Sequence, residues 1–88
     1  MYFVYILQST RTKRFYVGHC DHLINRFRRH QRGDNPSTRN RGPWWMPYFE
    51  VYPSRAEAMA REREIKRKKS SKSIRAIIRR NLPALELL

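Results

Sequence analysis

A chain of 88 residues is long enough for one domain and too short for two, and a domain of this size has a small core. Hydrophobic residues make up 40% of it, with only three glycines and five prolines, which excludes a disordered chain. Twenty Lys and Arg against seven Asp and Glu give a formal net charge of +13, so an anionic partner is expected, and nucleic acid is the default one.

The first predicted element is a β-hairpin. Two aromatic and β-branched runs, residues 1–8 and 15–19, flank a polar stretch that contains the turn. With the turn early in that stretch, Tyr5 lies opposite Tyr16, so the two tyrosines become cross-strand neighbours on one face. Gly18 then leaves a gap beside them, into which another backbone can come close.

A helix, a loop and a third strand are predicted next. Asp21 is the expected N-cap of a helix over 21–32, and Gly33 is its expected stop. Residues 33–47 hold Gly, Pro, Asn and Ser without a period, which is typical of a loop. The alternating run 48–52 is the third strand.

Two further helices complete the chain. Helical spacing predicts one over 55–69 and a last one over 72–83, which Pro83 ends. The order β, β, α, β, α, α predicts an α+β domain, with helices packed on a small antiparallel sheet. We expect a single domain over residues 1–83 and a C-terminal tail over 84–88.

Glu62 is a carboxylate on the apolar face of the helix over 55–69, where it points between Ala58 and Ile65. An unpaired charge in such a place costs on the order of several kcal/mol, so it must be paired, neutralised or bound to a cation. Two interpretations stay open. One is an ion pair with Lys66 or Lys69 at the rim of the face, and the other is a functional site.

Basic residues on the first helix fall into two groups. Arg26 and His30 are four residues apart and border the sheet, so the pair is suited to act on one bound phosphate. The alternative is that both are ordinary amphipathic side chains with buried stems. Other basic residues point outward or lie in loops, and we expect them to contact phosphates non-specifically. These are Arg28, Arg29, Arg32, Arg39, Arg41, Lys66, Lys68, Lys69 and Lys72.

Two other groups of residues have ambiguous roles. His19, Cys20 and His22 hint at a metal site, but one cysteine and two histidines without a zinc-type spacing are a weak pattern. Trp44 and Trp45 either stack on bases or close a small core.

Membrane and disulfide partners are not expected. The apolar run 2–7 is too short to span a bilayer and lacks the features of a signal peptide. Cys20 is the single cysteine, so no intramolecular disulfide can form. We therefore expect a cytoplasmic protein and leave its oligomeric state open.

Four short motifs together resemble the GIY-YIG nuclease superfamily. They are Phe3-Val4-Tyr5, Tyr16-Val17-Gly18, Arg26-x3-His30 and Ala58-x3-Glu62-x2-Ile65-Lys66. The resemblance covers nearly the whole chain. It is greatest to small stand-alone bacterial members, which share the start Val4–Gln8 and Gly42-Pro43-Trp44 before the third strand. It implies a three-stranded antiparallel sheet between helices, and hydrolysis of a phosphodiester bond with one divalent metal ion.

The resemblance also implies roles for individual residues. Glu62 would hold Mg²⁺ or Mn²⁺, and Tyr5, with Tyr16 beside it, would be the general base or orient the attacking water. Because a phenol titrates near about 10, Tyr5 would need Arg26 or the metal close by to favour its phenolate. Arg26 would stabilise the charge that grows on the phosphate, and His30 would assist proton transfer or grip the phosphate.

The chain departs from the family pattern at several positions. Phe3 and Val4 replace Gly and Ile, which affects little because the tyrosine that follows carries the chemistry. His19 and Cys20 stand where a Tyr-Thr pair is common, so the rim of the site differs. The family tends to place an asparagine late in the domain, and Asn81 is the candidate here.

The sequence thus predicts a nuclease that cuts DNA, or RNA, by metal-assisted hydrolysis. A bare domain has little surface for sequence readout, so we expect selectivity for the structure of the substrate rather than for its sequence. The alternative is a non-catalytic nucleic-acid-binding protein that keeps the fold. The inward carboxylate of Glu62 favours the enzyme.

Overall fold

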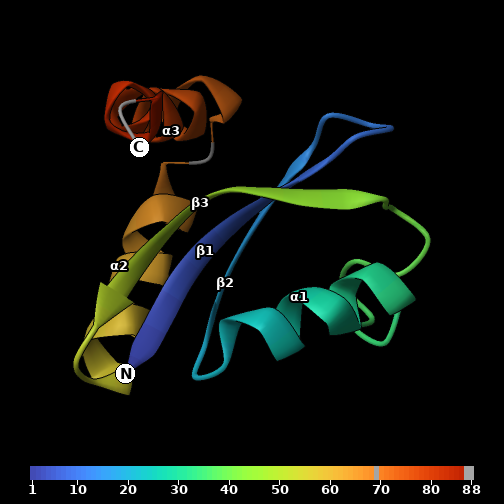
Figure 1. The fold of residues 1–88 in the computed structure, drawn as a ribbon, viewed down its shortest axis with the longest axis horizontal. Coiled ribbons are helices and arrows are strands. Elements are labelled where there is room, and N and C mark those ends of the chain that lie inside the picture. Colours follow the sequence, from blue (N-terminus) through green and yellow to red (C-terminus); the bar gives the residue numbers. More distant parts are fainter. Residues whose placement is uncertain (69, 87–88) are drawn as a thin grey trace.

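A three-stranded antiparallel sheet with three helices forms the fold (Figure 1). The computed structural model describes residues 1–68 and 70–86, with side chains described as far as Arg80. The sheet order is β2-β1-β3, so β1 is central. This confirms the α+β architecture expected from the sequence. The elements are β1 (Tyr2–Ser9), β2 (Phe15–Cys20), α1 (Leu23–Arg32), β3 (Trp44–Tyr52), α2 (Arg55–Arg67) and α3 (Ser71–Glu86).

The helices cover both faces of the sheet, α1 on one side and α2 with α3 on the other (Figure 1). Successive side chains of a strand point to opposite faces. Val4 and Ile6 therefore pack with Ile65 of α2, whereas Tyr5 and Leu7 form a second cluster on the α1 side. We call these the α2 face and the α1 face. Burial on both faces explains the unbroken apolar run of β1.

The β1–β2 hairpin forms, but its predicted register was wrong by two residues. Tyr5 lies opposite Gly18, and Leu7 lies opposite Tyr16. A turn placed later in the polar stretch is the cause: Lys13 has a φ of 66° and donates its backbone N–H to Ser9. Because the shift is an even number of residues, both tyrosines still lie on the same face.

Helix α1 begins later than predicted. Its N-cap is His22, whose ring accepts a hydrogen bond from the backbone N–H of Asn25, so Asp21 is not the cap. Gly33 ends the helix as predicted, with a φ of 80° in the left-handed region that a glycine adopts without strain.

Strand β3 begins at Trp44, four residues before its expected start at Tyr48. The prediction failed because Pro47 was taken as part of a loop. A proline is tolerated in an edge strand, and the register with β1 shifts between Ile6 and Gln8, next to Pro47.

The two C-terminal helices also differ from their predicted bounds. Helix α2 ends at Arg67, and Lys69 lies outside the described residues. Helix α3 continues past Pro83 to Glu86, so Pro83 does not end it as predicted, although an interior proline ordinarily kinks or breaks a helix. The side chains of residues 81–86, Asn81 included, and residues 87–88 lie outside the described part. Within the described ranges, no helix is both long and apolar enough to cross a membrane.

A half-buried carboxylate joins α2 to the sheet. Glu50 of β3 accepts hydrogen bonds from Arg61 of α2, at 2.9 Å, and from the hydroxyls of Tyr48 and Tyr52. Burial alone would raise the pKa of Glu50, but these hydrogen bonds lower it below its ordinary value. Arg61 also pairs with Glu64 within α2, so the contact of Arg61 with Glu50 is the one that joins this helix to β3.

Candidate active site

Tyr5 is buried at the centre of the α1 face, with 1% of its surface exposed. Its phenol lies over Gly18 of the neighbouring strand, where a Cβ atom would be 2.6 Å from the phenol oxygen. We expected another backbone segment to lie in the space beside Gly18. The ring of Tyr5 fills that space instead. Glycine is needed at this position because no other residue leaves room for the phenol.

Replacing Gly18 with alanine is expected to displace Tyr5. The added methyl group would overlap the ring, and overpacking of this kind costs about 1–3 kcal/mol. Thermal unfolding measures the loss of stability, and a crystal structure of the variant shows the position of the phenol. A variant with unchanged stability and an unmoved Tyr5 would contradict the packing described here.

Tyr5 begins a chain of buried hydrogen bonds. Its hydroxyl lies 2.8 Å from Nε2 of His30, and Nδ1 of His30 lies 2.7 Å from the hydroxyl of Thr38. Both His30 and Thr38 are 1% exposed. The Thr38 hydroxyl in turn donates to the backbone carbonyl of Asn35, at 3.4 Å.

This chain of bonds sets the tautomer of His30. The Thr38 hydroxyl donates its one proton to the carbonyl of Asn35. Its oxygen therefore accepts the hydrogen bond from Nδ1–H of His30. Nε2 of His30 then has a free lone pair and accepts the hydroxyl proton of Tyr5. The geometry therefore suits transfer of a proton from Tyr5 to His30.

The pKa values of the two groups oppose that transfer in the free protein. Burial, followed by the nearby Tyr16, raises the pKa of Tyr5 well above its ordinary value, and the charge of Arg26 opposes part of the rise. Burial and the positive charges of Arg26 and Arg29 lower the pKa of His30 to about 4. At neutral pH Tyr5 is thus a phenol, and His30 is an uncharged imidazole able to accept a proton.

His30 is expected to make the protein less stable in acid. Its pKa is about 4 in the folded state against 6.5 ordinarily, so the unfolded state binds more protons between these values. The stability is present in full above about pH 6.5 and falls, by on the order of 2–3 kcal/mol, as the pH approaches 4. Urea unfolding at about pH 7 and pH 4.5 measures this loss. A His30→Gln variant should lose less, and an equal loss in both proteins would contradict the assignment.

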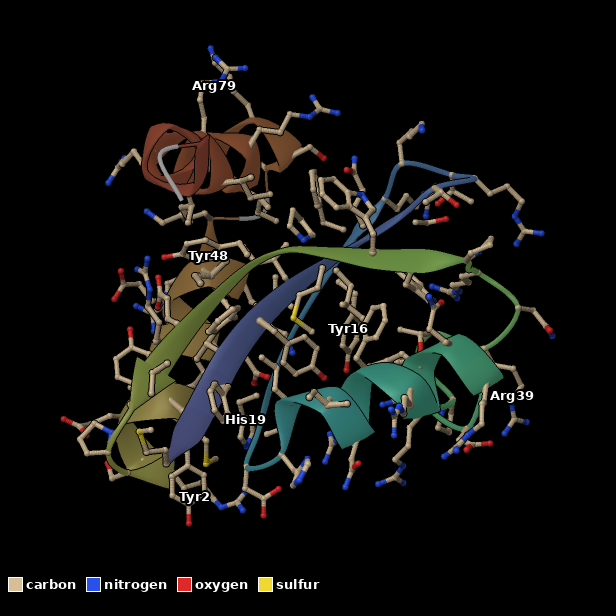
Figure 2. The ribbon with its side chains drawn as sticks, in the orientation of Figure 1. Tyr2, Tyr16, His19, Arg39, Tyr48 and Arg79 are labelled. Atoms are coloured by element: carbon tan, nitrogen blue, oxygen red, sulfur yellow. The ribbon has the colours of Figure 1, made fainter. Side chains whose placement is uncertain are left out.

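Tyr16 and Arg26 complete the group on the α1 face. The ring of Tyr16 lies 5.0 Å from that of His30 and 6.4 Å from that of Tyr5, measured between centroids. Figure 2 shows Tyr16 between the sheet and α1. Arg26 is half-buried on α1, close enough for its charge to act on both Tyr5 and His30. Four of the predicted site residues therefore meet here, and we call them the tyrosine–histidine group.

Glu62 lies on the other face of the sheet. Its carboxylate is 3.2 Å from Nδ1 of His19 and 3.7 Å from Nζ of Lys66, and its side chain is 17% exposed. His19 shares the α2 face with its partner Val4 and directly follows Gly18 in β2. The structure thus places Glu62 and the tyrosine–histidine group on opposite sides of β2, which is an edge strand. The ion pair with Lys66 considered from the sequence does form.

The residues around Glu62 fit a magnesium-type ion better than zinc. Among the residues whose side chains are described, no three His, Cys, Asp or Glu side chains come together as a metal cluster. His22 caps α1 and Cys20 is buried on the α1 face, so the zinc site hinted at by the sequence does not assemble. A single accessible carboxylate is what Mg²⁺ needs when phosphate and water supply the other ligands.

The predicted phosphate-binding residues do not form one patch. Arg28 and Arg29 are exposed on the outer side of α1, and Arg39 lies beyond the end of that helix (Figure 2). Arg41 lies, like Arg39, in the loop between α1 and β3. Lys66 is on α2 and contacts Glu62, Lys68 is exposed at the C-cap of α2, and Lys72 is exposed on α3, whereas Lys69 lies outside the described residues. Arg32 pairs with Asp34.

Three polar residues of the site were missed in the sequence. Thr38 and Ser9 are fully buried, and the side-chain amide of Gln31 bonds both the N–H and the C=O of Trp44. Nothing in the loop containing Thr38 marks it as buried, because the loop has no periodic pattern. Thr38 is eight residues after His30 in the sequence. This spacing indicates a contact between them only if the loop is already known to fold back onto α1.

Comparison with known proteins agrees with this geometry. The family model described as the GIY-YIG catalytic domain matches residues 1–75. A UPF0213 protein of Clostridium perfringens is 37% identical over 68 residues, which are 76% of this chain and 72% of that protein. The solution NMR structure of a UPF0213 protein of Bacillus halodurans has a TM-score of 0.55 at 30% identity, covering 89% of this chain and 83% of that one. The chain therefore belongs to the GIY-YIG family, a nuclease-type family, and has UPF0213 proteins among its homologues.

Proposed function

We propose that this protein hydrolyses phosphodiester bonds of nucleic acid, with DNA as its main substrate, in a reaction that depends on a divalent metal ion. The observation that carries the proposal is the hydrogen bond of 2.8 Å between the Tyr5 hydroxyl and Nε2 of His30, two buried groups on the face that also holds Tyr16 and Arg26.

In the proposed reaction a water molecule attacks the phosphorus atom, the P–O bond to one of the two nucleosides breaks, and the leaving oxygen takes a proton from solvent. The oxygen of Tyr5 takes a proton from this water while its own proton passes to Nε2 of His30, so the phenol is never a free phenolate. This route avoids a free phenolate at Tyr5, whose pKa is raised, but it requires the negative charge of the bound phosphate to raise the pKa of His30. Arg26, on the same face, stabilises the negative charge that develops on the phosphate oxygens.

Glu62 would hold the metal ion, either Mg²⁺ or Mn²⁺. A divalent ion bound there supplies charge stabilisation for the phosphate and the leaving oxygen. Glu62 is suited to this because its side chain is still 17% exposed, and His19 and Lys66 are its ion-pair partners among the described residues. His19 keeps Glu62 at β2, and Lys66, on the solvent side, can turn towards phosphate. A cytoplasmic location and DNA rather than RNA as substrate remain parts of this proposal.

Thr38 is a positioning residue in this reaction. Replacing it with valine removes the hydroxyl that holds Nδ1–H of His30, and replacing it with serine keeps that hydroxyl. We expect Thr38→Val to slow cleavage by about ten- to a hundredfold and Thr38→Ser to slow it little. Nitrogen NMR of His30 reports the tautomer directly. Equal rates in the two variants, with an unchanged tautomer, would refute the role of Thr38.

The proposed function is tested with a cleavage assay. Labelled single-stranded, duplex and branched DNA, and a matched RNA, are incubated with the protein in Mg²⁺, in Mn²⁺ and in a chelator. We expect metal-dependent cutting with little sequence preference, since the domain is small. Binding without cutting of any substrate would instead favour the rival function, a nucleic-acid-binding protein that has kept the fold.

A further inference from the structure

A pocket opens beside the tyrosine–histidine group. It has a volume of about 620 Å³ and lies where the β1–β2 hairpin meets the loop between α1 and β3. Phe15, Tyr16 and Trp44 supply its aromatic lining, and Arg14 and Arg41 also line it. The volume falls in the range of roughly 300–1,000 Å³ that is common for small-molecule sites.

Hydrogen bonds give the pocket a fixed shape. Ser9, which is fully buried, donates to the carbonyl of Arg41 at 2.6 Å and accepts from the backbone N–H groups of Arg11 and Thr12. The guanidinium of Arg11 bonds the carbonyl of Asn40. The hairpin and the loop are therefore tied together, and a ligand would meet a surface that already exists.

The two arginines of the pocket have no counter-charge. Both Arg14 and Arg41 are exposed, and neither guanidinium has a hydrogen bond or an ion pair with any other described residue. Arg32, by contrast, is paired with Asp34. Two unpaired guanidiniums at one pocket are suited to hold an anion such as a phosphate.

The aromatic lining indicates which kind of molecule the bound phosphate belongs to. Tyr16 is half-buried, so part of its ring is open for contact on the α1 face, whereas the Phe15 ring packs on the α2 face with Arg75 over it at 5.8 Å. A base stacks on such a ring only when it is unpaired, because the faces of a base within a duplex are already covered. Tyr16 also contacts the tyrosine–histidine group, since its ring is 5.0 Å from that of His30. A strand bound at Tyr5 thus extends into the pocket.

We propose that this pocket binds one unpaired nucleotide next to the phosphodiester bond that is cut. The base stacks on Tyr16, and its phosphate binds Arg14 and Arg41. This inference rests on the proposed function and names its substrate class: strands with unpaired nucleotides at the cut, as in an overhang, a flap or a junction, rather than continuous duplex.

Binding without metal tests the pocket independently of cleavage. In a chelating buffer, fluorescence anisotropy compares an oligothymidylate of about ten nucleotides with an abasic strand that has as many phosphates. Since stacking contributes about 1–3 kcal/mol per base, we expect the oligothymidylate to bind at least about fivefold more tightly. Equal affinity would mean that only the phosphate charge is recognised, and would overturn the proposal.

A pair of charge variants places the binding at this pocket. Ser37 lines the pocket and is exposed, so Ser37→Glu adds a carboxylate beside Arg41 without disturbing the core. Ser71→Glu adds the same charge at an exposed position of α3. We expect oligothymidylate binding to weaken about tenfold in the first variant and no more than about threefold in the second.

Equal weakening in the two variants would overturn the pocket as the binding site. The outcomes also separate this proposal from the function on which it rests. Tighter binding of the oligothymidylate without any cleavage would support the pocket and refute the proposed hydrolysis. Metal-dependent cleavage without that preference would support the hydrolysis and refute the pocket.

Discussion

Replacing Glu62 with glutamine is expected to abolish metal-dependent cleavage, with a loss of about a thousandfold or more in the single-turnover rate. The amide has nearly the same shape as the carboxylate but no charge, so it cannot hold a divalent ion. The charge stabilisation that the ion supplies is worth several kcal/mol, and about 4 kcal/mol corresponds to that loss. Among the described residues Glu62 pairs with His19 and Lys66, both partly exposed, so the fold should persist when its charge is removed.

Glu64→Gln is the matched control for this variant. Glu64 lies on the same helix, two residues on, but its side chain is 60% exposed and paired with Arg61. It should cut at close to the wild-type rate. Binding of Mn²⁺, followed by electron paramagnetic resonance, should disappear in Glu62→Gln and persist in Glu64→Gln. Cleavage that survives in Glu62→Gln would show that the metal is held elsewhere.

Replacing Tyr5 with phenylalanine is expected to slow cleavage by about a hundred- to ten-thousandfold, the usual worth of a general acid–base group. The ring still fills the space over Gly18, but no oxygen remains to receive the proton of the attacking water. His30 also loses its partner on Nε2, which costs about 1–3 kcal/mol of stability because the group is buried.

Tyr2→Phe is the control for the loss of a phenol. Tyr2 lies at the start of the same strand and is only half-buried, with Arg55 over its ring at 4.8 Å. Its substitution should leave the cleavage rate nearly unchanged. Unfolding in urea at the assay temperature checks that Tyr5→Phe remains folded. A folded Tyr5→Phe protein with the wild-type rate would show that the buried hydroxyl has only a structural role.

The sequence predicted the order of elements because their signals are local. The stop at Gly33 and the period of α2 depend on neighbouring residues only. The errors fell where distant contacts decide the structure. Pro47 is compatible with a strand only because β3 lies at the edge of the sheet, and the turn of the hairpin depends on the contacts of Ser9 with a loop far along the chain.

The candidate site was predictable in its members but not in their arrangement. The motifs singled out Tyr5, His30 and Glu62, yet they do not tell which face of the sheet each occupies. The face that each residue occupies depends on the order of the strands, which places Glu62 on the opposite side of β2 from Tyr5 and His30. Thr38 was missed because its burial results from the folding of a loop and not from any local pattern.

The central claim is that the tyrosine–histidine group and Glu62 form one active site around the edge strand β2. Single-turnover cleavage by the wild type, Tyr5→Phe, Glu62→Gln and the double variant tests it most directly. Groups that act together in one transition state have strongly non-additive effects. The account predicts that the double variant is no more than about threefold slower than the slower single variant. Effects that multiply in full would show that Tyr5 and Glu62 act separately, and would contradict the claim.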